Sequence, residues 1–289
     1  MKNLYVFPVV MVLSAIVPVW DMPLIGSDLA QFSILAGGYA TYGAGAVASG
    51  KVGALDYIVG GAGAASAGDD TNTTGVNNAL LQLGAAQRAL NFMQTTSILA
   101  PTVSGFIELA PGVYSASALT TAAGTTLHLD GGGLENPVWV FNIPTYLVTG
   151  ASTSISIINA GANASVIWNT GGYVSMGAST SFLGTILSGA YISQGAGSDF
   201  SCGNLFASSY VSLSAGSQVT STACKETDSW AGSLQGLGAN LDIADGIAVA
   251  HIVIDDPTSA VPEPKTTFLI GLGFGLLGLF RMQRKVPSA

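Results

Sequence analysis

The sequence predicts a mainly β solenoid, a β-helix of about seven coils, and its repeats, their alternation and their spacing lead to this fold class. A seven-residue phrase recurs along the chain, for example as Tyr173-Val-Ser-Met-Gly-Ala-Ser179. Repetition at such a period indicates coils that bury their apolar sides by stacking. The other copies start at Tyr39, Tyr57, Tyr146, Tyr191 and Tyr210, with a weaker copy at Ala118.

Alternation and spacing point to strands. The shortest intervals between copies, as from Tyr39 to Tyr57 and from Tyr173 to Tyr191, define the coil, and the longer intervals leave room for surface excursions. A coil of about 18 residues is too short for a helical hairpin repeat and suits a β-helix. Since strand side chains alternate between faces, two apolar rows are predicted to point inward. They are Leu119, Leu147, Val174, Ile192 and Val211, and Leu127, Ile155, Phe182, Phe200 and Val219.

One long helix is predicted over residues 76–97, where the phrase is absent. Apolar residues recur there at three- and four-residue steps, which is typical of a single buried stripe. Asp69, Asp70, Thr73 and Thr74 are candidates for its N-cap. Such a helix would be about 33 Å long, close to the rise of seven stacked coils. The stripe comprises Val76, Ala79, Leu80, Leu83, Ala86, Leu90 and Met93.

Composition limits the classes of function. The chain has 289 residues, of which 8% are charged and 38 are glycine, yet 49% are hydrophobic, which favours a packed solenoid over disorder. Between residues 27 and 260 there are 3 basic and 14 acidic residues, so this segment carries 3 − 14 = −11. Such a surface repels polyanions and excludes nucleic-acid binding.

The N-terminus predicts export. A charged start and the apolar run 4–19 are typical of a secretory signal, so we assign residues 1–26 to a signal peptide or an uncleaved anchor. Cleavage after Ala15 fits this pattern. In an exported protein, Cys202 and Cys224, which are separated by about one coil, are expected to form a disulfide between coils. Two buried thiols are the alternative.

The C-terminus carries an ordered set of three features. Pro262-Glu263-Pro264 precedes the apolar run 268–280, and Arg281, Arg284 and Lys285 follow. Residues 261–289 therefore closely resemble the PEP-CTERM sorting signal of Gram-negative bacteria. The resemblance implies export to the cell surface, an exosortase-type processing enzyme and a transient inner-membrane anchor. The apolar run is short for a stable span, which takes about 20 residues, and a simple tail anchor is the alternative.

Several motifs of the central segment occur in order: Phe32-Ser-Ile-Leu-Ala-Gly37, the alanine-rich helix, Pro111-Gly-Val-Tyr-Ser115, Val138-Trp-Val-Phe-Asn142 and Phe182-Leu-Gly-Thr-Ile-Leu187. Over residues 27–224 the chain resembles the microbial ice-binding-like family. The resemblance implies a right-handed discontinuous β-helix with one flanking helix. Coils before the helix need not stack beneath those that follow it. Residues 225–260 lie outside the resemblance and are expected to form a cap and linker, with a strand over residues 246–254.

The resemblance also implies a flat ice-binding face. Members often carry Thr-Ala/Gly-x-Thr/Asn near one turn, and the matching segments here begin with alanine in every coil, as in Ala178-Ser-Thr-Ser181. The predicted face consists of Thr125, Thr126, Thr153, Ser154, Thr180, Ser181, Ser198 and Ser217. The alternative for these hydroxyls is structural, since solenoid turns need small polar residues.

A second surface is formed by Tyr146, Tyr173, Tyr191 and Tyr210, which alternation points outward. Exposed aromatic rings could bind exopolysaccharide or another cell surface, unless the helix covers them. We therefore predict adsorption to ice, with an adhesion or biofilm-matrix role as the alternative.

An enzyme is not predicted. The carboxylates are scattered, His128 and His251 have no identified partner, and neither zinc-ligand spacing nor a cofactor motif is present. Four carboxylates near the C-terminus could hold calcium, but a solvated acidic linker explains them better. They are Asp242, Asp245, Asp255 and Asp256.

Overall fold

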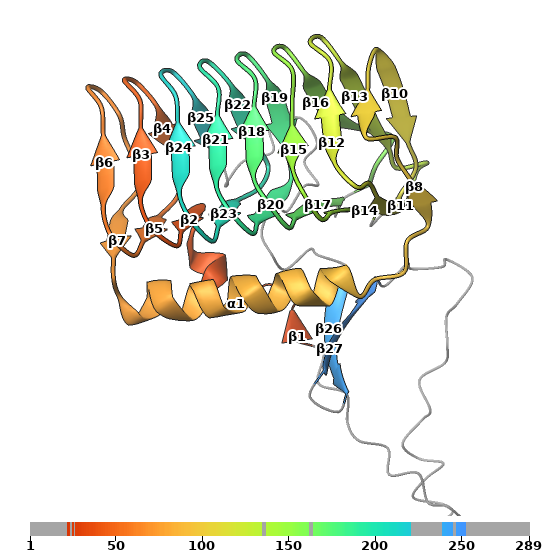
Figure 1. Ribbon diagram of the computed structural model, residues 1–289, viewed down its shortest axis with the longest axis horizontal. Helices are drawn as coiled ribbons and strands as arrows, with labels where there is room; N and C mark the ends of the chain where they lie inside the picture. Colours follow the sequence, from red (N-terminus) through yellow and green to blue (C-terminus); the bar gives the residue numbers. More distant parts are fainter. Residues whose placement is uncertain are drawn as a thin grey trace, which may run out of the picture. The chain divides into compact units, whose positions relative to one another are not determined.

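Three parallel β-sheets form the walls of a β-helix in the computed structural model, and one long helix lies along it (Figure 1). The structure describes residues 22–23, 25, 27–134, 137–161, 164–220, 239–244 and 247–252. A short 3-10 helix, η1 (Leu29–Gln31), precedes the first coil. The predicted fold class is therefore confirmed.

A complete coil contributes one strand to each of the three sheets, which are numbered in the order in which the chain passes through them. Sheet 1 stacks β7 (Asp69–Thr71), β5 (Val52–Ala54), β2 (Ile34–Ala36), β23 (Leu205–Ala207), β20 (Thr185–Ser188), β17 (Ser165–Thr170), β14 (Val138–Ile143), β11 (Gly112–Ser115) and β8 (Ser97–Ile98). Sheet 2 stacks β6 (Ile58–Gly60), β3 (Ala40–Tyr42), β24 (Val211–Leu213), β21 (Ile192–Gln194), β18 (Val174–Met176), β15 (Leu147–Val148), β12 (Leu119–Thr121) and β9 (Thr102–Val103). Sheet 3 stacks β10 (Phe106–Leu109), β13 (Thr126–Asp130), β16 (Ser154–Ile158), β19 (Ser181–Leu183), β22 (Asp199–Ser201), β25 (Gln218–Thr220) and β4 (Val47–Ala48).

The stacking order is not the sequence order. The first coil, β2–β3–β4, pairs with the last, β23–β24–β25, and the second coil, β5–β6, lies on its other side. This is the discontinuity that the family resemblance implies. Sheet 2 contains eight strands, one more than the predicted coils, because β9 belongs to a coil that lacks the tyrosine phrase.

The interior is apolar, and both predicted inward rows are buried. Trp139 and Trp168 are fully buried, and their ring N–H groups donate to the carbonyl oxygens of Leu109 and Leu183 at 3.0 and 2.9 Å. The Trp168 ring stacks on Phe141 with a centroid distance of 3.9 Å. Each fully buried large apolar side chain contributes about 1.5–3 kcal/mol.

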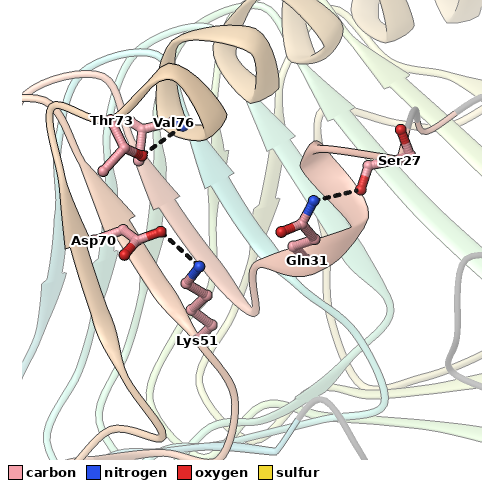
Figure 2. A network of polar contacts seen from close by, with 6 residues as sticks. All are labelled: Ser27, Gln31, Lys51, Asp70, Thr73 and Val76. Atoms are coloured by element: carbon pink, nitrogen blue, oxygen red, sulfur yellow. Dashed lines mark hydrogen bonds and ion pairs between the residues drawn. The ribbon is translucent and has the colours of Figure 1, made fainter.

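The helix α1 (Thr74–Asn91) covers sheet 1. The Thr73 side chain caps it by accepting from the Val76 N–H at 3.2 Å, beside the Lys51–Asp70 ion pair at 2.5 Å (Figure 2). The predicted stripe is confirmed, because most of its residues are buried against sheet 1, Leu80 and Met93 are partly buried, and Ala89 joins them. This second core consists of Val76, Ala79, Leu83, Ala86, Ala89 and Leu90 against Leu35, Val140, Ile167, Leu187 and Phe206, among others.

The predicted C-terminal bound of the helix, residue 97, is wrong, because α1 ends at Asn91. Two asparagine contacts hold this end: the Asn142 amide donates to the Leu90 carbonyl at 2.8 Å, and the Asn169 amide donates to Asn91 Oδ1 at 2.8 Å. The chain then joins sheet 1, where the Thr96 N–H donates to the Val113 carbonyl at 2.8 Å. Sheet pairing thus competes with the last helical turn.

The folded part begins before the predicted boundary at residue 27, because Ile25 is 1% exposed within the core beneath α1. A small antiparallel sheet joins β1 (Met22–Pro23), β26 (Ala239–Ala244) and β27 (Ile247–Ile252). The last two strands fall in the predicted cap and linker, 225–260. No helix within the described ranges is both long and apolar enough to cross a membrane. The apolar runs 4–19 and 268–280 lie outside those ranges.

Candidate functional site

The inner hydroxyl ladder, defined as Thr125, Thr153, Thr180, Ser198 and Ser217, is buried, with exposures of 0–1%. Its placement on an ice-binding face is therefore wrong. The Thr125, Thr153 and Thr180 hydroxyls each donate at 2.8 Å to a carbonyl oxygen of their own turn. Those of Ser198 and Ser217 donate at 2.9 Å to a glycine carbonyl of the neighbouring coil. The ladder satisfies turn backbone inside the solenoid.

The alternation of side-chain direction along each strand explains why the ladder does not face outward. Thr153 lies two residues before the inward-facing Ile155 on β16, so it points inward as well. The residue before each ladder position has a positive φ, from 56° at Ser179 to 71° at Gly124. This left-handed residue turns the chain sharply between sheets 2 and 3 and directs the next side chain into the core.

The outer row of sheet 3 holds the other predicted hydroxyls, Thr126, Ser154 and Ser181, which do face outward. They lie in register on β13, β16 and β19. Phe106, 63% exposed, precedes them on β10, and Asp199 follows them on β22. Only three short hydroxyls therefore stand together in this row.

Sheet 2 presents a longer row that the sequence reasoning missed. Its members lie between inward-pointing neighbours, and each is half-buried or exposed. None is charged. We call this row the hydroxyl face: Thr102, Thr120, Val148, Ser175, Ser193, Ser212, Thr41 and Val59, in register across the stack. The sequence feature that marks this row is the third residue of the seven-residue phrase, which is Thr, Ser or Val in every copy.

Small residues extend the hydroxyl face toward the turn. The fifth position of the phrase is mostly glycine, and a Cβ at Gly177 or Gly195 would lie 2.5 Å from a backbone atom of the adjacent coil. The sixth position is an exposed alanine in every copy. This surface thus carries side chains no larger than threonine or valine from sheet 2 to the turn.

The tyrosine ladder runs beside the hydroxyl face. Tyr57, Tyr39, Tyr210, Tyr191, Tyr173 and Tyr146 stack in this order, with centroid distances of 4.8–5.5 Å. The helix does not cover them, because it packs on sheet 1. Burial, together with Tyr191 and Tyr39, raises the pKa of Tyr210. Sugar stacking needs free ring faces, and these rings cover one another, so the geometry does not favour the predicted adhesion face.

Among the described residues, the other predicted candidates are not gathered into a site. His128 packs edge-on against Phe106 with a centroid distance of 4.8 Å. In the described segments, no three His, Cys, Asp or Glu side chains gather as a metal site.

Two buried tyrosines have raised pKa values. Burial, and to a smaller extent the negative charge of Asp69, raises the pKa of Tyr42, and burial raises the pKa of Tyr114. Cys224 and Pro262, Glu263 and Pro264 lie outside the described residues, so the Cys202–Cys224 disulfide stays a prediction.

Stacked parallel coils with rows of short, repeated outward side chains define a β-solenoid that presents flat, periodic surfaces. Comparison with known proteins narrows this class. A family model described as Ice-binding-like matches residues 27–220, two thirds of the chain, which therefore belongs to the ice-binding-like family. A model of the PEP-CTERM protein-sorting motif matches residues 260–285. Both resemblances predicted from the sequence are confirmed.

Individual relatives agree with the family. An ice-binding protein of Nostoc sp. (strain HG1) is 35% identical over 103 residues, 36% of this chain and 38% of that protein. Ice-binding protein 1 of Shewanella frigidimarina (strain NCIMB 400) is 32% identical over 108 residues, 37% of this chain and 12% of that protein. The matches thus span less than two thirds of either relative.

One solved structure is similar over a larger share. The crystal structure of an ice-binding protein from the Antarctic ascomycete Antarctomyces psychrotrophicus is 27% identical with a TM-score of 0.59. The similarity covers 70% of this chain and 98% of that one.

Proposed function

We propose that this protein adsorbs to ice through the hydroxyl face of sheet 2 and acts without catalysis. The observation that carries the proposal is an in-register row of eight short, uncharged side chains on rigid parallel strands. Family membership and the names of the relatives support ice as the ligand.

Two physical properties of the hydroxyl face favour binding to ice: its side chains are regularly spaced, and they lose little entropy on contact. Parallel strands repeat at about 4.8 Å, so the row offers hydroxyl and methyl groups at a constant spacing to a crystalline surface. Ser, Thr and Val lose little rotamer freedom on contact. The Thr41 hydroxyl also donates to that of Ser212 at 3.1 Å, which fixes the orientation of both. Many weak contacts at matched spacing then add up over the face.

Sheet 3 suits ice less well. Asp199 interrupts its outer row, and Glu108, His128 and Asp130 share its outward side. Charged groups hold their hydration water strongly and resist replacement by a neutral lattice contact. The row of Thr126, Ser154 and Ser181 is therefore the second candidate for the ice face.

Thermal hysteresis and ice recrystallisation inhibition of the purified protein would test the proposal. Ser175→Tyr and Ser193→Tyr place bulky rings on the hydroxyl face, and we expect activity to fall about ten-fold, because few lattice contacts survive a protruding ring. Ser154→Tyr and Ser181→Tyr are the matched controls on sheet 3 and should retain activity.

Each result separates the faces. Loss confined to the sheet 3 variants would move the site to Thr126, Ser154 and Ser181. An unsubstituted protein that is folded yet inactive in both assays would overturn ice binding itself.

We also propose export by an N-terminal signal, recognition of the Pro262-Glu263-Pro264 motif by an exosortase, and a transient inner-membrane anchor in a Gram-negative cell. The match to the sorting motif over residues 260–285 supports this route. Mass spectrometry of the surface protein would show whether residues 268–280 are removed, and their retention would contradict processing.

A further inference from the structure

The turn between β7 and α1 contains an acceptor motif for N-linked glycosylation. Asn72-Thr-Thr74 has the form Asn-x-Ser/Thr, which marks surface asparagines that receive an oligosaccharide in exported proteins. Bacterial sites of this kind also carry an acidic residue two places before the asparagine, and Asp70 occupies that place. The sequence contains one other such triplet, Asn163-Ala-Ser165, but there the corresponding residue is Gly161. Asn72 is therefore the asparagine that meets both requirements.

The structure leaves the Asn72 side chain available. Asn72 is exposed, and its side-chain amide has no hydrogen-bond partner among the described residues. Its backbone has a φ of 51°, a left-handed conformation that asparagine tolerates better than most residues do. The Asn72 backbone N–H donates to the Ala54 carbonyl at 2.9 Å, so the main chain is held while the side chain is not. A sugar attached to this amide would displace no contact of the fold.

The other residues of the motif have partners that an acceptor segment must give up. The Thr73 hydroxyl accepts from the Val76 N–H at 3.2 Å, and Asp70 is paired with Lys51 at 2.5 Å (Figure 2). Thr74, whose hydroxyl the motif requires, is exposed as the first residue of α1. Since residues 70–74 must leave the cap and the ion pair to enter an enzyme, we expect the transfer to precede formation of α1.

The position of Asn72 gives the modification a physical benefit. Asn72 directly follows β7, which is the terminal strand of sheet 1. Unpaired strand edges invite pairing with other chains, and proteins commonly cover them. A hydrated oligosaccharide at this end would shield the edge of β7. The middle coils of the hydroxyl face, which contain Ser175 and Ser193, would stay uncovered.

We propose that Asn72 is an N-glycosylation site of the exported precursor. The donor is an oligosaccharide on a polyprenyl pyrophosphate, and a membrane oligosaccharyltransferase catalyses the transfer. The Asn72 side-chain nitrogen forms a bond to the anomeric carbon of the first sugar and loses a proton. The bond between that carbon and the pyrophosphate oxygen breaks, and the polyprenyl pyrophosphate leaves. This inference rests on the proposed export route and is independent of ice binding.

The transfer can be measured in a Gram-negative host that makes a bacterial oligosaccharyltransferase and a polyprenyl pyrophosphate-linked oligosaccharide of known mass. The full chain would be expressed with its own N-terminus and, in parallel, behind an established secretion signal. Peptide mass spectrometry of the periplasmic protein should show one oligosaccharide on Asn72 and none on Asn163. An unmodified Asn72 in the exported protein would overturn the proposal. Modification only behind the established signal would support the site and contradict the proposed N-terminal signal instead.

Matched variants test the role of each motif residue. Thr74→Ala should abolish the modification and Thr74→Ser should retain it, because the motif needs the hydroxyl. Asp70→Asn should lower the glycosylated fraction of Asn72 about ten-fold, the effect expected when a charge-assisted hydrogen bond to the enzyme is lost. Lys51→Met breaks the same ion pair but keeps the motif, so it is the control and should not lower this fraction. An equal loss in Asp70→Asn and Lys51→Met would overturn recognition of Asp70 by the enzyme.

Discussion

Buried threonines at the turns serve the backbone, and their hydroxyls have a measurable structural role. Thr153 donates to the Gly150 carbonyl at 2.8 Å and shares a second hydrogen bond of 2.8 Å with the Thr121 hydroxyl. Thr121 in turn accepts from the Gly150 N–H at 3.0 Å. These bonds lock one turn to the coil beside it. Because the network is closed within the core, one missing hydroxyl leaves its partners unpaired.

Thr153→Val keeps the shape of the side chain and removes this hydroxyl. We expect the free energy of unfolding to fall by about 1–3 kcal/mol, since two buried partners lose a hydrogen bond. Urea denaturation would measure the change, and ice activity should persist. Ser154→Ala, one residue away and outward-facing, is the control and should stay within about 0.5 kcal/mol. An unchanged stability for Thr153→Val would mean that these buried hydrogen bonds make no net contribution to folding.

At the scale of one coil, two glycines of the same turn meet different requirements. Gly197 has φ of 63° and an added Cβ would have no neighbour within 4 Å, so only backbone conformation restricts it. Gly195 has an ordinary φ, but a Cβ there would approach Gly177 to 2.5 Å. The first glycine permits the bend and the second permits close stacking.

Gly197→Ala should therefore cost about 1–2 kcal/mol, the usual penalty of a left-handed alanine. Gly195→Ala should cost more than this, because backbone of the next coil must move to admit the methyl group. Thermal unfolding of the two variants gives the comparison. A milder effect at Gly195 than at Gly197 would mean that the coils separate easily at this corner.

The elements also show what the sequence can predict. Inward rows such as Leu147 and Val174 and the buried stripe of α1 follow from periodicity, because side-chain direction repeats with the backbone. The end of α1 does not, because it depends on Asn142 and Asn169, which are distant in sequence. Alternation alone places Ser175 and Ser193 of the hydroxyl face outward, whereas the family's turn motif points to residues at the start of sheet 3.

For the whole molecule, the N-terminal segment is part of the fold. Ile25 is in the core, and β1 pairs with β26. A cleavage of the proposed signal that keeps this segment must therefore lie upstream of residue 22. We expect N-terminal sequencing of the exported protein to place the new terminus between Ala15 and Met22. A terminus beyond Ile25 would contradict the docking of this segment, and Ala15→Leu should block cleavage if Ala15 precedes the cut.

The position of the first coil has a consequence for how the protein folds. Thr41 pairs with Ser212, a sequence separation of 171, so β2–β3–β4 has no stacking partner from the last coil until nearly the entire domain is present. Such high contact order slows folding. A chain that crosses a membrane N-terminus first would carry its earliest coil paired only with the second coil until the last one emerges. Because the fold is completed late, the precursor stays unfolded enough to be translocated. During that time its strand edges lack partners, and such edges are targets for chaperones.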